Sequence, residues 1–205
     1  MTEQQKTGMK IETLAINEIN LADYANIPIS YQVRSKLDVK LLDNGLGGMV
    51  FHEEKVIPPY TKDHDRLITG ENPTTWTARF DVTNWAFLMA RIGEMPVGGA
   101  TIAFRTQGVD MLDRRDDLTV LWDIRVRPEH RRSGIGTKLF AEAAKWSKER
   151  GCSQLKVETQ NINVPTCRFY TRQGCRLGEV HRYKYIHHPA VAHEIMLVWY
   201  LDLRK

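Results

Sequence analysis

The chain has 205 residues, a formal net charge of +4, and 42% apolar and 26% charged residues, an ordinary composition for a globular protein. This length suffices for one domain with a sizeable core, which we expect over residues 10–205, and the polar residues 1–9 are predicted to be disordered. No apolar run approaches the roughly 20 residues that cross a bilayer, and the N-terminus lacks an apolar signal core. We therefore expect a cytoplasmic protein without membrane contact.

Neither the cysteines nor the histidines have the spacing of a ligand set. Cys152, Cys167 and Cys175 are odd in number and contain no Cys-x-x-Cys pair, so they are predicted to be reduced thiols. The histidines around Pro189 lack a carboxylate or cysteine at metal-ligand spacing and are predicted to lie in a solvated turn. No dense basic block with interleaved aromatic residues occurs. We expect no metal and no nucleic acid partner.

Up to residue 117, strand-like segments alternate with turn signals. The two prolines after Ile57 predict a loop over 58–65, because proline cannot donate to a strand ladder. A hairpin with a four-residue turn at 93–96 is predicted next, followed by a charged connection over 110–117. The strands predicted in this part are 10–14, 29–42, 48–57, 84–92 and 97–105.

A strand, a turn and a helix follow. Leu118–Val126 is rich in β-branched and apolar residues, and Pro128 then ends the strand. From Ile135 onward, apolar residues recur at helical spacing until Gly151, a natural C-terminal stop. The pattern predicts a helix of about four turns.

The first turn of this helix is predicted to bind a diphosphate. Arg131, Gly134 and Gly136 form the pattern Arg-x-x-Gly-x-Gly. The first amides of a helix lack internal acceptors and carry the positive end of the helix dipole, so they favour an anion. Glycine lets a phosphate approach the backbone, and Arg131 and Arg132 add guanidinium groups. The chain has no Gly-Lys-Ser/Thr, which excludes a nucleotide-hydrolase loop, and the arginines do not fit a dinucleotide fingerprint.

The C-terminal third continues the alternation of strands and helices. Residues 154–159 predict a short strand that pairs in parallel with the strand before the helix, through a right-handed crossover. A second helix is predicted from near Pro165 to Gly174. Strands over 177–186 and 193–203 complete a mixed α/β sheet, and the last one is apolar enough to be buried on both faces.

The diphosphate turn resembles a known motif. The acetyl-CoA motif of the GNAT superfamily of N-acetyltransferases is similar to Val126-Arg127-Pro128 followed by Arg131-Arg132-Ser133-Gly134-Ile135-Gly136. The resemblance implies an α/β (α+β) GNAT fold with a mixed, mostly antiparallel central sheet around an acetyl-CoA-binding strand, turn and helix. It implies acetyl-CoA as cosubstrate, with its diphosphate on the turn and its pantetheine along the strand. The cofactor-binding residues implied are Ile124, Arg125, Val126, Arg131, Arg132, Ser133, Gly134, Ile135, Gly136, Thr137, Asn163 and Tyr170.

Acyl transfer to an amine needs a neutral amine, a donor to the carbonyl oxygen and a proton for the leaving thiolate. The second GNAT motif resembles residues 163–174, and it implies Tyr170 as the general acid near the sulfur and Asn163 against pantetheine. The oxyanion donor is expected to be a main-chain amide near Arg125 or Val126.

Two acids are candidates for the general base. Glu158 matches the position of an acid that several superfamily members use to take the amine proton, although a structural ion pair explains it equally well. Asp123, on the strand before the phosphate turn, is the second candidate. Many relatives carry Glu one position earlier, where this chain has Trp122, and this departure from the family pattern leaves the identity of the base open. The choice between Glu158, Asp123 and a water relayed by either stays open.

The acceptor is suggested by four further stretches, 59–63, 157–165, 183–185 and 199–200, which are similar to the streptothricin acetyltransferases. This resemblance implies acetylation of a primary amine in the β-lysine moiety of streptothricin, by direct transfer in a ternary complex, which causes antibiotic resistance. A cationic acceptor suits acids and aromatic faces. The candidate substrate-binding residues are Tyr60, Asp63, Asp65, Trp122, Asp123 and Glu158.

Other functions stay open at this point. A protein N-terminus or a polyamine is an alternative acceptor, and a non-catalytic acyl-CoA-binding regulator is an alternative of another class. The sequence does not decide the oligomeric state, and a homodimer is compatible with it.

Overall fold

The computed structural model describes residues 8–67 and 72–204. They group into two compact units, the first with residues 8–29, 72–156 and 202–204, and the second with residues 30–67 and 157–201. Of the segment predicted to be disordered, residues 1–7 lie outside the described residues. Met9 opens the first strand, so the prediction of disorder is wrong at that residue.

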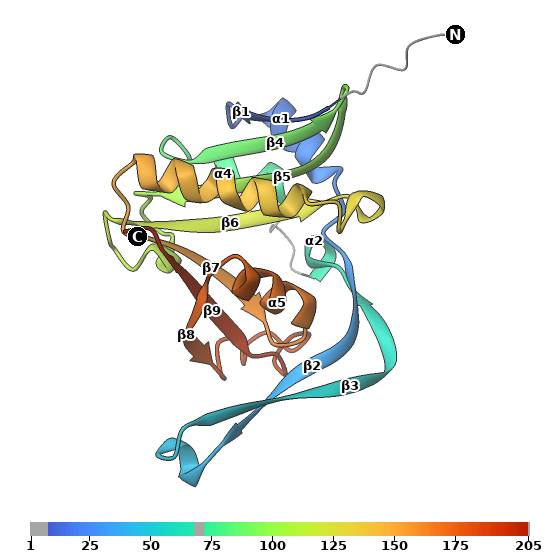
Figure 1. The fold of residues 1–205 in the computed structure, drawn as a ribbon, viewed down its shortest axis with the longest axis vertical. Coiled ribbons are helices and arrows are strands. Elements are labelled where there is room, and N and C mark those ends of the chain that lie inside the picture. Colours follow the sequence, from blue (N-terminus) through green and yellow to red (C-terminus); the bar gives the residue numbers. More distant parts are fainter. Residues whose placement is uncertain (1–7, 68–71, 205) are drawn as a thin grey trace. The chain divides into compact units, whose positions relative to one another are not determined.

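The first unit is built on a mostly antiparallel sheet, as predicted (Figure 1). Neighbouring strands are antiparallel except β6 and β7, which pair in parallel from Leu118 opposite Gln154 to Val120 opposite Lys156. The strands, in sheet order, are β1 (Met9–Leu14), β4 (Ala86–Ile92), β5 (Met95–Phe104), β6 (Leu118–Val126) and β7 (Gln154–Gln160).

Helices α4 (Ile135–Glu149) and α1 (Glu18–Ala25) cover opposite faces of this sheet (Figure 1). A Cβ atom on Gly98 would meet Ile135 of α4 at 3.1 Å, whereas one on Gly99 would meet the ring of Tyr24 of α1 at 2.7 Å. Because consecutive strand residues point to opposite faces, the two glycines show which helix packs on which face. Both helices approach β5 closely, and at Gly99 a larger residue would force the Tyr24 ring or the backbone to move.

The α1 face of the sheet holds a hydrophobic cluster of the first unit. Tyr24 and Phe87 are fully buried there with their ring centroids 5.1 Å apart. Helix α3 (Trp76–Arg79) adds Trp76, whose ring lies 6.1 Å from that of Tyr24. Burial of aromatic rings of this size stabilises a fold by roughly 1.5–3 kcal/mol per side chain. The cluster therefore anchors α1, which was not among the predicted elements, to the sheet.

The second unit contains the end of β7, then β9 (Met196–Asp202) and β8 (Arg176–His181), in that sheet order, with helix α5 (Val164–Arg172) and the short helix α2 (His64–Leu67). Strands β2 (Tyr31–Leu41) and β3 (Met49–Lys62) form a separate antiparallel hairpin. No helix within the described ranges is long and apolar enough to cross a membrane.

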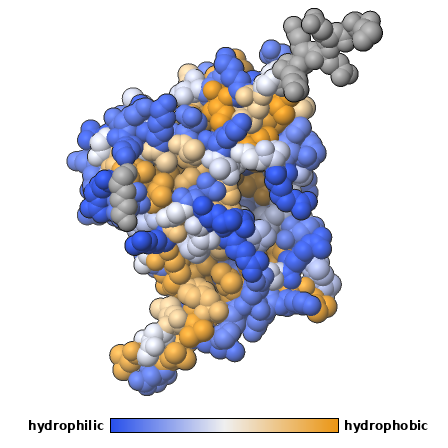
Figure 2. All heavy atoms as spheres, in the orientation of Figure 1, coloured by the Kyte–Doolittle hydropathy of each residue, from blue (hydrophilic) through white to orange (hydrophobic). Residues whose placement is uncertain are grey.

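The tip of the β2–β3 hairpin is an apolar surface of the second unit (Figure 2). Leu46 is 91% exposed there, and Leu42 and Met49 are each 48% exposed. Asp43–Gly45, which lies between the predicted strands 29–42 and 48–57, forms a short 3-10 helix. Asn44 and Gly45 adopt positive φ angles of 53° and 108°, which asparagine and glycine accept more readily than other residues.

The predicted loop over 58–65 is wrong for its first half, since β3 continues to Lys62. The register explains how the strand accommodates Pro58 and Pro59. Val33 pairs with Tyr60, whereas Ser35 pairs with Lys55, so the prolines fall in an irregular segment between two regular stretches of the ladder. A proline at such a bulge is tolerated because its missing N–H is not needed there.

Three other predicted boundaries also differ. The β4–β5 turn has two residues rather than four, because Ile92 pairs with Met95. The strand predicted over 177–186 ends at His181 and is followed by turns, and the one predicted over 193–203 begins at Met196. The predictions of β6, α4 and α5, which carry the motifs, are confirmed.

Candidate active site

The first turn of α4 exposes backbone amides at the place of the predicted diphosphate site. Gly134 is the N-cap with a φ of +87°, and no side chain in the described part of the chain caps the helix. The first helical bond runs from the Lys138 amide to the Gly134 carbonyl, 3.1 Å apart, so the amides before Lys138 find no acceptor inside the helix. By contrast, Asn17 caps α1 and Asn163 caps α5. The motif helix therefore begins with donors available to an anion.

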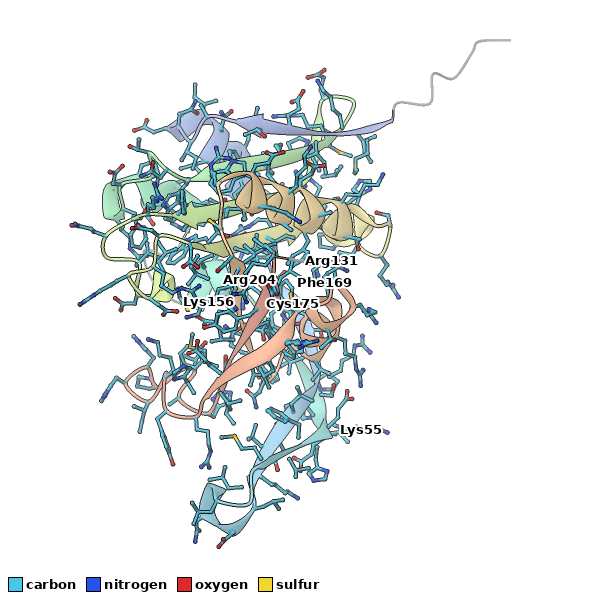
Figure 3. The ribbon with its side chains drawn as sticks, turned by 60° about the vertical axis from the view of Figure 1, so that its left-hand side comes forward. Lys55, Arg131, Lys156, Phe169, Cys175 and Arg204 are labelled. Carbon is cyan, nitrogen blue, oxygen red and sulfur yellow. The ribbon has the colours of Figure 1, made fainter. Side chains whose placement is uncertain are left out.

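Arg131 fastens this turn to its surroundings (Figure 3). Its Nε donates to the carbonyl oxygen of Val126 at 3.0 Å, and its Nη2 donates to that of Pro28 at 3.3 Å. Partial burial lowers the pKa of its guanidinium. Arg132 is exposed with a φ of +64°, and the Ser133 hydroxyl donates to the carbonyl of His130 at 2.6 Å. Arg131 thus ties the turn to the end of β6, while Arg132 stays on the surface.

Asp123 and Arg125 form a buried, bidentate ion pair. The Arg125 guanidinium donates from Nε and Nη2 to the two carboxylate oxygens of Asp123, at 3.0 and 2.7 Å. The Tyr24 hydroxyl donates to Oδ1 at 2.5 Å. The side chains of Asp123 and Arg125 are only 9% and 1% exposed. Both oxygens of this predicted base are therefore already bound by donors of its own unit.

Trp122 packs into the aromatic cluster of the first unit. Its ring lies edge-on against Phe80 with centroids 5.2 Å apart, and 5.5 Å from the ring of Trp85. The side chain remains partly accessible. Part of the aromatic face expected for the acceptor is thus used in packing, and its contact with an acceptor stays a prediction.

Glu158, the other candidate base, stands on β7 in the second unit and is partly buried. The Tyr185 hydroxyl donates a hydrogen bond to its Oε1, and Gln160 donates to the same oxygen at 3.3 Å. Burial, and secondly the charge of Glu158, hold the pKa of Tyr185 well above its usual range, so the phenol stays a neutral donor. These donors orient the Glu158 carboxylate and offset the cost of burying its charge.

A buried ion pair accompanies Glu158 in the same unit. The Lys62 ammonium contacts the Glu194 carboxylate, and the two side chains are only 4% and 3% exposed. Burial lowers the pKa of Lys62, a shift that the bond to Glu194 opposes. Burial, and next the charge of Glu194, also raise the pKa values of Tyr31 and Tyr60. The second unit therefore contains a group of interacting polar residues near β7 and the base of the hairpin. The group consists of Glu158, Glu194, Lys62, Tyr31, Tyr60 and Tyr185.

Helix α5 holds the two residues of the second motif. Tyr170 is 2% exposed and lies on the buried face of the helix with Cys167. Asn163 is the N-cap, and its Oδ1 accepts a bond from the Thr166 amide at 3.3 Å. The capping role explains why Asn163 stands two residues before Pro165, since proline is well suited to the first turn of a helix.

The three remaining predicted residues lie at the base of the hairpin. Tyr60 is 40% exposed. Asp63 accepts from the Asp65 amide at 3.2 Å and pairs with Arg66 at 3.5 Å, and both acids are partly accessible. Tyr60 and the two acids therefore have surface available to a cationic molecule.

The predicted site residues are divided between the units. The first unit carries Trp122, Asp123, the strand 124–126 and the turn 131–137, and the second carries the rest. Asp123 and Arg125 are brought into direct contact, and Arg131 binds the backbone of Val126. Within the second unit, Glu158 contacts residues that the sequence analysis did not select. These contacts of Glu158 are Gln160 and Tyr185. The sequence analysis also missed the Lys62–Glu194 pair of the second unit and, in the first unit, Tyr24, which contacts Asp123.

Comparison with known proteins supports the resemblance of this chain to the GNAT superfamily. The model of the family described as "Acetyltransferase (GNAT) family" matches residues 50–175. Streptothricin acetyltransferase A of Bacillus subtilis (strain 168) is 38% identical over 78 residues, 38% of this chain and 44% of that protein. Streptothricin acetyltransferase of Escherichia coli is 34% identical over 85 residues, 42% of this chain and 49% of that protein. The matched part thus spans about half the length of these relatives.

Solved structures show the same fold over nearly the whole chain. A nourseothricin acetyltransferase has a TM-score of 0.73 at 22% identity, covering 96% of this chain and 99% of that one. A protein of Bacillus anthracis str. Ames, solved in complex with acetyl coenzyme A, has a TM-score of 0.73 at 23% identity, covering 95% and 99%. At these identities the likeness shows a shared fold.

Proposed function

The chain belongs to the acetyltransferase (GNAT) family, and we propose that it is an acetyl-CoA-dependent N-acetyltransferase. The observation that carries this proposal is the uncapped first turn of α4, which follows Arg131 and begins at Gly134. Exposed amides and the helix dipole together favour a diphosphate at this turn. Arg132 supplies a surface cation beside it, and the backbone of 124–126 leads from the turn along β6.

The proposed reaction uses one acid and one base. A bond forms between the acceptor nitrogen and the acetyl carbonyl carbon, and the bond from that carbon to the CoA sulfur breaks. Glu158 takes the proton that the amine loses, and Tyr170 gives a proton to the leaving thiolate. Glu158 is preferred to Asp123 as the base because both oxygens of Asp123 are bound by Arg125, with Tyr24 on one of them.

The burial of Cys167 in the second unit favours direct transfer of the acetyl group over a covalent acetyl-enzyme. Cys167 stands one helical turn before Tyr170, but it is 3% exposed and burial raises the pKa of its thiol. A buried, protonated thiol is a poor nucleophile. The proposal therefore contains no covalent acetyl-enzyme, and the amine attacks acetyl-CoA in a ternary complex.

For the acceptor we propose a primary amine in the β-lysine moiety of streptothricin. The similarity to the two streptothricin acetyltransferases supports this choice. A polycationic acceptor also suits the accessible part of Tyr60 and the acids Asp63 and Asp65, since ammonium groups bind carboxylates and aromatic faces. Resistance to this antibiotic would be the biological consequence.

Replacing Tyr170 by Phe tests whether the protein is an enzyme. Loss of a general acid is expected to lower the rate of CoA release by about 100- to 10,000-fold and to weaken acetyl-CoA binding far less, because the ring remains in place. Tyr183→Phe is the matched control, because Tyr183 is 68% exposed, and it should keep the wild-type rate. A wild-type protein that binds acetyl-CoA but releases no CoA with any amine would instead be a non-catalytic binder.

A further inference from the structure

Strand β6 contains a bulge next to the segment assigned to acetyl-CoA. Thr101 of β5 pairs with Asp123, and the next residue, Ile102, pairs with Leu121. Trp122 is therefore an extra residue in β6, and such a bulge disrupts the ladder locally. Regular alternation would send Trp122 and Asp123 to opposite faces of the sheet.

The contacts show that both residues lie on the α1 face. Trp122 packs against the cluster that contains Phe80, and Asp123 bonds to Tyr24 of α1. Arg125, two residues beyond Asp123, returns to the same face and reaches Tyr24 as well. The bulge thus decides which side chains of β6 point toward α1 for the remainder of the strand.

Three side chains hold the strand in this register. Asp123 receives the two guanidinium bonds from Arg125 and the Tyr24 hydroxyl. The guanidinium carbon of Arg125 lies 4.9 Å from the Tyr24 ring centroid, and its Nη1 donates to the carbonyl of Ile27 at 3.2 Å. Tyr24 is fully buried and Arg125 is 3% exposed. A buried polar network in which each member has partners favours one arrangement strongly over others.

We propose that Tyr24, Asp123 and Arg125 are positioning residues that hold the bulged strand β6 in the register required to bind acetyl-CoA. The inference rests on the proposed function, because it assumes that the backbone of 124–126 flanks the cosubstrate. Asp123 then acts through Arg125 and Tyr24 and takes no proton from the acceptor. The backbone after α1 adds two further contacts. Arg125 donates to the carbonyl of Ile27, and Arg131 of the diphosphate turn donates to the carbonyl of Pro28.

The sharpest variant is Tyr24→Phe. It keeps the ring that packs on Phe87 and under Arg125 and removes the hydroxyl, which bonds to Asp123 and also lies 3.2 Å from the Gly99 carbonyl oxygen. The dissociation constant of CoA, measured by calorimetry, is expected to rise about tenfold, whereas kcat at saturating acetyl-CoA stays within about threefold of wild type. Asp123→Asn weakens both guanidinium bonds as well, and it should raise the dissociation constant of CoA further than Tyr24→Phe does.

Tyr200→Phe provides a matched control. It also removes a hydrogen bond from a tyrosine to a carboxylate, that of Glu179, in the second unit. CoA affinity should be unchanged in this variant. A lower melting temperature with wild-type CoA affinity in Tyr24→Phe would show that the cluster is merely structural and would overturn the inference.

Two other outcomes separate this inference from the proposed function. A fall in kcat of more than about 100-fold in Asp123→Asn, with CoA affinity unchanged, would make Asp123 the base and contradict the positioning role. Wild-type protein that does not bind CoA at all would overturn the proposed function, and the inference with it.

Discussion

The hydroxyl of Tyr185 donates to the Oε1 of Glu158, so the candidate base is oriented by a residue that lies 27 positions later in the chain. Tyr185 belongs to the turns between β8 and β9, and Glu158 stands on β7. A carboxylate on a strand has several side-chain rotamers, and a hydrogen bond of this kind selects one of them. The turn after β8 therefore takes part in preparing Glu158 for its proposed task.

Tyr185→Phe is expected to lower kcat/KM for the acceptor about tenfold, because Glu158 loses its orienting donor. Affinity for CoA should remain that of the wild type. Steady-state kinetics with the acceptor and a separate CoA titration measure the two quantities. An unchanged kcat/KM would mean that Tyr185 has no part in orienting the base.

Glu158→Gln should lower kcat by about 100- to 10,000-fold while leaving the fold and CoA affinity intact, since the amide cannot take a proton and has nearly the same shape. Single-turnover measurements of acetyl transfer follow the chemical step. If Glu158→Gln keeps more than about a third of the wild-type kcat, a different base serves the reaction.

Gly134→Glu is expected to abolish CoA binding, because it places a carboxylate at the anion-binding turn and a side chain at a φ of +87°. Gly151→Glu is the control at the other end of α4, where the φ is +75° and an added Cβ would likewise meet no atom within 4 Å in the described residues. Its backbone strain is similar and it should keep CoA affinity. Equal CoA affinity in the two variants would rule out the phosphate turn.

Lys62→Met should destabilise the protein by about 3–5 kcal/mol, because it leaves the Glu194 charge buried without its lysine partner. The double variant Lys62→Met with Glu194→Gln should recover most of that loss. Urea denaturation of the single and double variants gives the free energies of unfolding. A double variant as unstable as Lys62→Met alone would show that the lost stability does not come from the unpaired charge.

The free energy of unfolding should fall as the pH rises above about 9, partly through Cys175. Burial raises the pKa of this thiol from 9.0 to about 12 in the folded protein. Between these values the unfolded state has released the proton and the folded state has kept it, so stability decreases with pH. Cys175→Ala should therefore flatten the decline measured by urea denaturation at pH 8 to 11 under reducing conditions; an equally steep decline would contradict this assignment.

The elements that carry the motifs were the most predictable part of the fold. Leu118–Val126 and Gln154–Gln160 have the residues of buried strands, and the helix between them ends at Glu149, just before the glycine stop. Each of these patterns is local. The prolines of β3 illustrate the opposite case, because only the irregular pairing with β2 makes a strand possible there.

The side chains that contact the candidate bases could not be predicted, because these contacts join residues that are far apart in the sequence. Tyr24 and Asp123 are 99 residues apart, and the bulge that brings them to one face is set by the pairing of β5 and β6. Helix α1 did leave a signal, since Asn17 is a good N-cap and Leu21 and Tyr24 follow at helical spacing. The turn that holds Tyr185 has no comparable periodicity.

The most direct test incubates the purified protein with acetyl-CoA and streptothricin, beside spermidine, lysine and an aminoglycoside, and follows thiol release together with the mass of the acceptor. The account predicts saturable CoA release with streptothricin, and a product that carries one acetyl group on an amine of its β-lysine moiety. Acetyl-CoA binding without acetylation of streptothricin would contradict the proposed acceptor, and a peptide with a free N-terminus would be the next acceptor to try.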